Sequence, residues 1–214
     1  MSCCMCKGFD TEFSHKRASK DLRRYRQKGP RRTTRILLDV LRNQGTEELS
    51  LLDIGGGVGA IQHELLSAGV NDVINVEASP AYLEAAKKEI KQQGHASRAK
   101  FFLGDFVELA PDIPPADIVT LDRVVCCYED FQQLVRLSSA RTNRFYGLVY
   151  PRNGWWVALV IWLENFYHWL TRSPFRAFSH PTEAVEAVVL NSGLRQLFYY
   201  KTFVWQVVLY SRGQ

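Results

Sequence analysis

The sequence lacks any long hydrophobic run, since no stretch reaches the roughly 20 apolar residues that a membrane-spanning helix requires. Residues 1–30 are basic and polar, where a secretory signal peptide would need an apolar centre. Both absences predict a cytoplasmic protein. With 214 residues and 46% apolar composition, the chain can bury one sizeable core, and a single compact domain is expected.

Cysteine is scarce, and its clustering excludes the disulfide framework of a small secreted domain, so reduced thiols are expected. The five cysteines are Cys3, Cys4, Cys6, Cys126 and Cys127. The first three resemble the start of a zinc site, but tetrahedral zinc usually needs four protein ligands and only His15 lies nearby. We therefore expect a disordered, reactive tail and no metal. The adjacent pair is interpreted as two small buried hydrophobic residues in preference to redox or metal groups.

Acidic residues are almost absent from residues 16–35, which contain ten Lys or Arg and one acid, Asp21. This segment carries a formal charge of +9, which leaves −4 for the remainder because the whole chain carries +5. The positive total thus reflects one local segment, and a general nucleic-acid-coating role is disfavoured. Gly29-Pro30 interrupts the pattern, so residues 1–30 are expected to form a flexible arm and residues 31–214 a single folded domain.

Strand-like and helix-like patterns alternate along the folded part, which predicts a mainly parallel sheet with helices on both faces. The expected helices are 31–43, 58–68, 81–93 and 129–140, and the expected strands are 49–54, 72–77, 101–103, 116–122 and 144–150. After helices at 153–171 and 181–191, two strands at 194–201 and 203–210 end the chain. With about one residue, Thr202, between them, they form either an antiparallel hairpin or one interrupted strand. We expect the hairpin.

A glycine-rich loop follows the first expected strand. Asp53 ends that strand, and Gly55, Gly56, Gly57 and Gly59 stand where the chain turns into the next helix. Glycine permits the turn and a close approach of a ligand to the backbone. The spacing differs from the G-x-G-x-x-G pattern of dinucleotide oxidoreductases, and no phosphate-binding Lys-Ser/Thr pair follows.

Two further features lie at the ends of the next strands. Glu77 ends the second strand, where a carboxylate can accept hydrogen bonds from both hydroxyls of a ribose, and Ala78 follows it. Asp105 and Phe106 follow the third strand. Together with the D-x-G-x-G-x-G loop, this arrangement resembles the class I methyltransferases, which implies a Rossmann-like α/β fold and S-adenosyl-L-methionine as cofactor. By that resemblance, Asp105 contacts the adenine amino group and Phe106 supplies a flat apolar contact.

Longer segments are similar to a group of small bacterial methyltransferases related to magnesium-protoporphyrin O-methyltransferase. The matching segments are LDIGGGVGAIQHELL (52–66), GDFVELA (104–110), ADIVTLDRVVCCYED (116–130) and GLVYPR (147–152). The resemblance covers most of the chain from about residue 30 onward. It implies an enzyme that methylates a small molecule, with the porphyrin itself only an analogy.

The acceptor is expected beyond the carboxyl end of the fourth strand, which places Asp122 through Tyr128 in the pocket. Asp122 is a candidate for both cofactor binding and catalysis. Tyr128 either lines the acceptor pocket or orients the cofactor, or else is a half-buried core aromatic. His180 is a candidate general base, although a capping or loop histidine is the alternative. A base is needed only if the acceptor keeps its proton, and a carboxylate acceptor needs none.

Two unusual segments leave several roles open. The basic segment 16–35 can close over an acidic substrate, dock on anionic lipid, contact RNA phosphates or form a solvated surface helix. A lid is favoured, because N-terminal segments commonly cap the acceptor side in the small-molecule methyltransferases that the chain resembles. Helix 153–171 contains nine consecutive apolar residues, Trp155 to Leu163, and must be covered. We expect the protein core and the acceptor pocket to cover this helix, and peripheral membrane contact is the second possibility.

The leading hypothesis is methyl transfer from S-adenosyl-L-methionine to an oxygen of a small aromatic or macrocyclic acceptor. An RNA methyltransferase that uses the basic arm and a non-catalytic cofactor-binding protein are the alternatives. Leu-Asp-Arg-Val at 121–124 stands where an Asn/Asp-Pro-Pro-Phe/Tyr tetrapeptide would favour methylation of the amino nitrogens of bases. Nucleic acid is therefore the less favoured partner.

Overall fold

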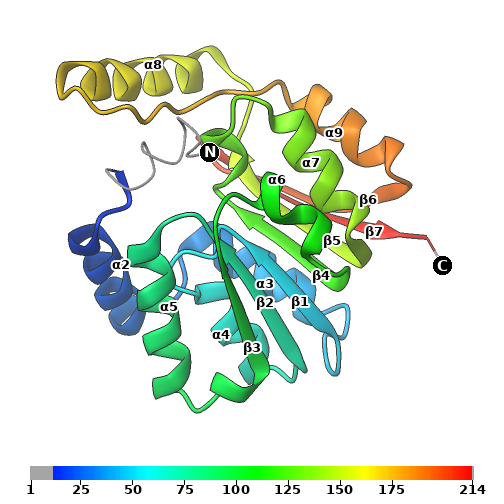
Figure 1. The fold of residues 1–214 in the computed structure, drawn as a ribbon. Coiled ribbons are helices and arrows are strands. Elements are labelled where there is room, and N and C mark those ends of the chain that lie inside the picture. Colours follow the sequence, from blue (N-terminus) through cyan, green and yellow to red (C-terminus); the bar gives the residue numbers. More distant parts are fainter. Residues whose placement is uncertain (1–11, 214) are drawn as a thin grey trace.

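A twisted sheet of seven strands forms the centre of the protein, in the order β3-β2-β1-β4-β5-β7-β6 (Figure 1). The computed structural model describes residues 12–213. The strands are β1 (Ser50–Ile54), β2 (Asp72–Glu77), β3 (Ala99–Leu103), β4 (Ala116–Asp122), β5 (Thr142–Pro151), β6 (Leu194–Lys201) and β7 (Trp205–Arg212). Strands β1 to β5 pair in parallel, whereas β7 runs antiparallel between β5 and β6. This arrangement confirms the α/β fold and the terminal hairpin.

Helices cover both faces of the sheet, which makes a three-layer structure (Figure 1). On one face lie α3 (Arg32–Arg42), α4 (Ala60–Ser67) and α5 (Pro80–Gln92), and on the other lie α6 (Phe106–Leu109), α7 (Phe131–Ala140) and α9 (Thr182–Asn191). Short 3-10 turns occur at η1 (Ala96–Arg98), η2 (Ala110–Asp112) and η3 (Val125–Cys127). Alternate residues of β1 point to the two layers, since Leu51 joins the core under α3 and α4, and Leu52 joins the core under α7 and α9.

The N-terminal segment differs from the expected flexible arm, because His15–Lys28 forms helix α2, which packs on α5. Ala18, Leu22 and Tyr25 are spaced at one helical face and are buried against a cluster that includes Val58 and Tyr82. The run of cations obscured this short apolar face in the sequence. Cys3, Cys4 and Cys6, for which a reactive tail without metal is expected, lie outside the described residues.

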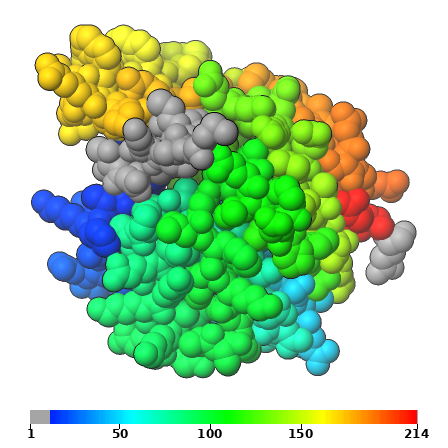
Figure 2. Space-filling view, in the orientation of Figure 1, coloured from blue at the N-terminus to red at the C-terminus, as the bar shows by residue number. Residues whose placement is uncertain are grey.

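Helix α8 (Trp155–Leu170) differs from the first-ranked expectation of burial in the core. Only Val157 and His168 of this helix are buried, while Trp155 is 77% exposed and Leu170 is 66% exposed. Figure 2 shows α8 standing out at the edge of the molecule. Within residues 12–213, no helix is both long enough and apolar enough to cross a membrane.

Candidate functional site

A row of buried polar side chains crosses the carboxyl ends of three neighbouring strands. Asp53 on β1 is in register with Asn75 on β2 and with Thr120 on β4, and all three are buried. Thr120 Oγ1 donates to Asp53 Oδ1 at 2.7 Å. Among the described residues, Asp53 Oδ2 and both amide atoms of Asn75 have no hydrogen-bond partner. Because buried polar atoms are rarely left unpaired, this row is suited to receive a polar ligand.

The glycine loop between β1 and α4 lies directly above this row. Gly55 and Gly57 adopt φ values of 63° and 57°, which side-chain-bearing residues seldom adopt. A Cβ on Gly56 would lie 2.3 Å from Asn75 Nδ2 and 2.6 Å from Asp53 Oδ2, so the backbone is pressed against the polar row. Gly59, at φ 83°, is the N-cap of α4 and explains why the helix begins at Ala60 and not at residue 58. The loop therefore presents its backbone at the carboxyl end of β1, where the glycines have no side chains to keep a ligand away.

Glu77 links this loop to the turn between β2 and α5. Its Oε2 accepts from the amide of Gly57 at 2.9 Å, and its Oε1 accepts from the amide of Ser79 at 2.9 Å. Burial raises the pKa of the Glu77 carboxyl, and these backbone donors oppose that shift. The carboxylate is thus fixed in position at the edge of the loop.

Asp105 and Tyr128 form a buried pair on the other side of the sheet edge. Asp105 Oδ1 accepts from the amide of Val107 at 2.9 Å and from the hydroxyl of Tyr128 at 2.5 Å. Burial raises the pKa of Tyr128, and the charge of Asp105 raises it further. The Tyr128 hydroxyl is therefore a hydrogen-bond donor that holds Asp105, which makes it unsuitable as a base near neutral pH.

Asp122 ends β4 and Arg123 follows it, and their side chains make only a long contact. Asp122 Oδ2 accepts from Thr34 Oγ1, and its Oδ1 lies 4.0 Å from Arg123 Nε. Burial raises the pKa of Asp122, while Arg123 lowers it. The Arg123 guanidinium donates to Thr33 Oγ1 at 2.7 Å and lies 4.7 Å from the ring centre of Trp205. The Arg123 Nε is buried and unpaired among the described residues.

A cavity of about 490 Å³ opens at this end of the sheet and collects most of the residues expected from the sequence. Those that line it are Asp53, Gly55, Gly56, Gly57, Glu77, Ala78, Phe106, Asp122 and Tyr128. Gly59, Asp105 and His180 do not line it. Asp105 accepts the hydrogen bond of the Tyr128 hydroxyl, and Tyr128, not Asp105, lines the cavity. This arrangement favours contact of a ligand with Tyr128 over contact with Asp105. Cys126 and Cys127 also line the cavity, and both are free thiols.

His180 does not line the cavity, where a general base would have to lie. Its Nε2 lies 2.8 Å from the carbonyl oxygen of Tyr128, and its ring is 4.3 Å from that of Phe131, centre to centre. Burial lowers the pKa of this histidine. The ring therefore holds the backbone at Tyr128 and does not line the cavity. This placement corrects the expectation of a catalytic His180.

Carboxylates set the charge at the donor end of the cavity. Asp53, Glu77 and Asp122 all line it, and the pKa of Asp53 is raised to about 7 by burial first and by its two acidic neighbours as well. Such a cluster repels the pyrophosphate of a dinucleotide and attracts a cation. The cofactor that the resemblance implies fits, since S-adenosylmethionine carries a sulfonium and an ammonium and has a ribose for Glu77. Asp53 Oδ2 and the Asn75 amide are the unpaired polar atoms beneath it.

Several residues of the site were missed by sequence reasoning. Thr120 could have been found once β4 was placed beside β1, because the two strands bring it level with Asp53. Arg24 and Trp205 lie far from the loop in the sequence; Arg24 was noted only as one of ten cations of the basic segment, and no local pattern marks Trp205. They reach the cavity because α2 packs on α5 and because β7 inserts beside β5.

A His180→Ala variant is expected to retain methyl transfer within about threefold, because the ring does not reach the cavity, and to lose about 1–3 kcal/mol of unfolding free energy. Urea denaturation and initial rates across pH 6 to 9 measure both effects. His15→Ala, at an exposed histidine, is the matched control. Loss of a titrating limb from the pH–rate profile in the His180 variant, with the protein folded, would restore the base assignment.

Comparisons with known proteins agree with this geometry. Residues 51–142 match the family model described as a methyltransferase domain. No curated protein matches the chain. Magnesium protoporphyrin IX methyltransferase from Synechocystis PCC 6803, solved with bound SAH, has a similar structure, with a TM-score of 0.73, 15% identity and coverage of 97% of this chain and 98% of that one.

Two other solved structures share the fold. An O-methyltransferase family protein from Burkholderia thailandensis superimposes with a TM-score of 0.71 and 16% identity, covering 95% of this chain and 62% of that one. An O-methyltransferase family 2 protein from Planctomyces limnophilus DSM 3776, in complex with apigenin, gives a TM-score of 0.61 and 16% identity, covering 87% and 63%.

Proposed function

We propose that this chain is a class I S-adenosylmethionine-dependent methyltransferase and that it methylates a carboxylate oxygen of a small aromatic or macrocyclic acid. The observation that supports this acceptor is a pair of arginines, Arg24 and Arg123, that line the same cavity as the carboxylates.

The two arginines come from different layers of the fold. Arg24 of α2 is half-buried and donates to the carbonyl oxygen of Gly29 at 3.3 Å, with no ion pair among the described residues. Arg123 Nε is buried without a hydrogen bond among the described residues, and its one acidic contact there is with Asp122 Oδ1 at 4.0 Å. By contrast, the cavity-lining Arg31 pairs with Asp21 at 3.1 Å. Arg24 and Arg123 therefore keep guanidinium N–H groups for an anionic ligand.

Neither of the two side chains expected from the sequence as candidate bases, Tyr128 and His180, is placed to remove a proton from an acceptor. The Tyr128 hydroxyl is committed to Asp105, and His180 lies outside the cavity. A carboxylic acid with an ordinary pKa of about 4 is already ionised at pH 7, so it requires no base. S-adenosylmethionine supplies a methyl group that its sulfonium has already activated. The protein's task is to hold the acceptor in line and exclude water.

The acceptor end of the cavity also has apolar walls. Val157, Val160 and Ile161 line it from α8, and Trp205 lines it from β7. Flat rings fit between such side chains, with Trp205 already stacked on the Arg123 guanidinium. The names of two similar structures include the ring compounds magnesium protoporphyrin IX and apigenin, which supports a ring-bearing acceptor for this chain.

Neutralising either arginine tests this proposal. Arg24→Gln and Arg123→Gln are each expected to raise the KM for a carboxylate acceptor by about 10- to 100-fold, because each removes a charge-assisted hydrogen bond. The Kd for S-adenosylmethionine should stay within about threefold. Arg23→Gln, on the exposed side of α2, is the matched control. An unchanged KM in both cavity variants would contradict the proposed acceptor end.

The acceptor class is identified by incubating the protein with methyl-labelled S-adenosylmethionine and cell extract, separated into small-molecule and RNA fractions. A methyl ester releases labelled methanol in mild alkali, whereas a methyl ether or an N-methyl group does not. We expect alkali-labile label in the small-molecule fraction. Label in RNA, or alkali-stable label alone, would overturn the carboxylate assignment and favour an RNA or hydroxyl acceptor.

A further inference from the structure

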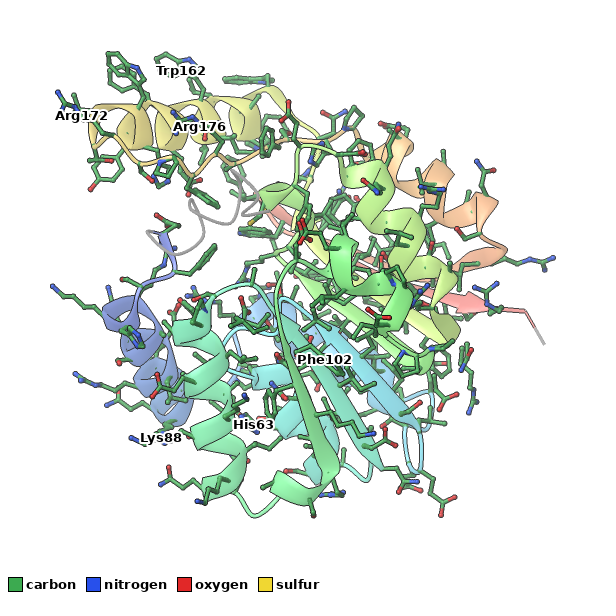
Figure 3. All side chains as sticks on the ribbon, in the orientation of Figure 1. His63, Lys88, Phe102, Trp162, Arg172 and Arg176 are labelled. Atoms are coloured by element: carbon green, nitrogen blue, oxygen red, sulfur yellow. The ribbon has the colours of Figure 1, made fainter. Side chains whose placement is uncertain are left out.

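Helix α8 has its polar and apolar sides arranged opposite to those of an ordinary surface helix. Its polar residues face the protein, since Glu164 lines the cavity, Asn165 bonds the backbone of Ala177 at 2.8 Å through both amide atoms, and His168 is buried. The other side carries Trp155, Leu159, Trp162, Leu163, Phe166, Trp169 and Leu170, all exposed. Figure 3 shows Trp162 pointing away from the sheet.

The exposed residues form one continuous surface. Their spacing of three and four positions places them along a single helical face, and the rings of Phe166 stack on those of Trp162 and Trp169, each at 5.7 Å. Phe166 is 48% exposed and Trp162 is 60% exposed, so these large apolar side chains stay in contact with solvent. An apolar surface of this size on a chain with a complete core indicates a binding surface.

Charge around α8 indicates what this surface binds. Over residues 152–181 the charged side chains are Arg152, Arg172 and Arg176, against the single acid Glu164, which is directed to the cavity. Figure 3 shows Arg172 extending from the far end of the helix. The contact between Phe13 and Phe175, with ring centres 5.7 Å apart, then brings the start of basic helix α2 beside this segment. Lys16 and Lys20 are exposed there.

We infer that α8 docks the protein on an anionic lipid surface, with the tryptophan side of the helix inserted at the headgroup level and the flanking arginines on the lipid phosphates. Tryptophan and arginine are the side chains suited to that boundary, where one end of a group is apolar and the other hydrated. At 16 residues, α8 is about 24 Å long and fits along the surface of a bilayer. The inference does not depend on the acceptor.

The docking also has a consequence for the cavity. Val157 and Ile161 line the cavity from the inner side of the same helix whose outer side would lie in lipid. An apolar ring compound dissolved in the bilayer would then reach the cavity along α8 without crossing open water.

Vesicle flotation of the full chain tests the docking. The protein is mixed with vesicles of phosphatidylcholine alone or with about one third phosphatidylglycerol, and its own tryptophan emission is followed in parallel. We expect flotation with the anionic vesicles, weakened by salt, and a blue shift of the emission. Trp162→Ser with Phe166→Ser should reduce the bound fraction at least about tenfold. Leu190→Ser, at an exposed leucine of α9, is the matched control and should leave it unchanged.

Two results would overturn the inference. One is that the full chain, shown to be folded by a cooperative thermal transition, does not float with vesicles of any lipid composition tested. The other is a dimer in sedimentation equilibrium that the Trp162→Ser, Phe166→Ser double variant dissociates, with no lipid binding by either form. That result would assign this side of α8 to a second copy of the chain.

Discussion

A Glu77→Ala variant is expected to raise the Kd for S-adenosylmethionine by roughly 100-fold or more, because the charge-assisted hydrogen bonds to the glycine loop and to the β2–α5 turn disappear together with the ribose acceptor. The Gly57 and Ser79 amides that now donate to this carboxylate would lose their partner. The glycine loop and the β2–α5 turn would then separate. Calorimetric titration with the cofactor measures the change.

Two further variants show whether the carboxylate itself is responsible. Glu77→Gln keeps the length of the side chain, but its amide group must oppose one of the two backbone donors, so binding should also fall at least about tenfold. Glu84→Ala removes an exposed carboxylate of α5, whose side chain is 75% exposed, and should leave the Kd unchanged. If folded Glu77→Ala bound the cofactor within tenfold of the original protein, the role assigned to Glu77 would be wrong.

An Asp53→Asn variant is expected to stabilise the free protein at pH 8 while weakening cofactor binding. The pKa of Asp53 is raised to about 7 from the ordinary value of 3.8. A carboxyl whose pKa is higher in the folded state contributes stability that is complete below pH 3.8 and is lost as pH rises through 7. Ionised Asp53 therefore costs the free protein roughly 2–4 kcal/mol at pH 8. Asparagine avoids this cost and keeps an acceptor for Thr120.

The same charge is an advantage once a cation is bound. Cofactor binding by the original protein should strengthen between pH 6 and pH 8, as Asp53 ionises, and the Asp53→Asn variant should lose that dependence. Urea unfolding at pH 5 and pH 8 gives the stability difference, and titrations at both values give the affinity difference. Equal unfolding free energies of the original protein and the Asp53→Asn variant at pH 8 would show that ionised Asp53 does not destabilise the free protein. Asp72→Asn, at the exposed start of β2, is the matched control.

The donor end of the cavity was predictable because its information is local. Asp53 and the glycines lie within seven residues, and Glu77 ends the next strand, so strand alternation alone brings them to one edge of the sheet. Helix α3 and strand β2 were predicted for the same reason. Their apolar spacing is strong, and tertiary contacts did not override it.

The acceptor end was less predictable because it is assembled from distant segments. His180 looked suitable as a base, but the strand-like segment beneath α8 is held by the bond from the Phe178 amide to the Cys126 carbonyl oxygen at 2.8 Å, which turns the histidine into the core. Arg24 belongs to the basic segment that was expected to act as a lid, but the sequence did not single it out from the other nine cations of that segment. The inward polar side of α8 likewise depends on Ala177, which no periodicity in the helix could indicate.

The assignment of the cavity is tested most directly by calorimetric titration of the full chain with S-adenosylhomocysteine, and in parallel with NAD. The three carboxylates and the unpaired Asp53 oxygen predict one site per chain for S-adenosylhomocysteine, competitive with S-adenosylmethionine, and no heat of binding for NAD. Binding of NAD with no response to either sulfonium-derived ligand would contradict the assignment.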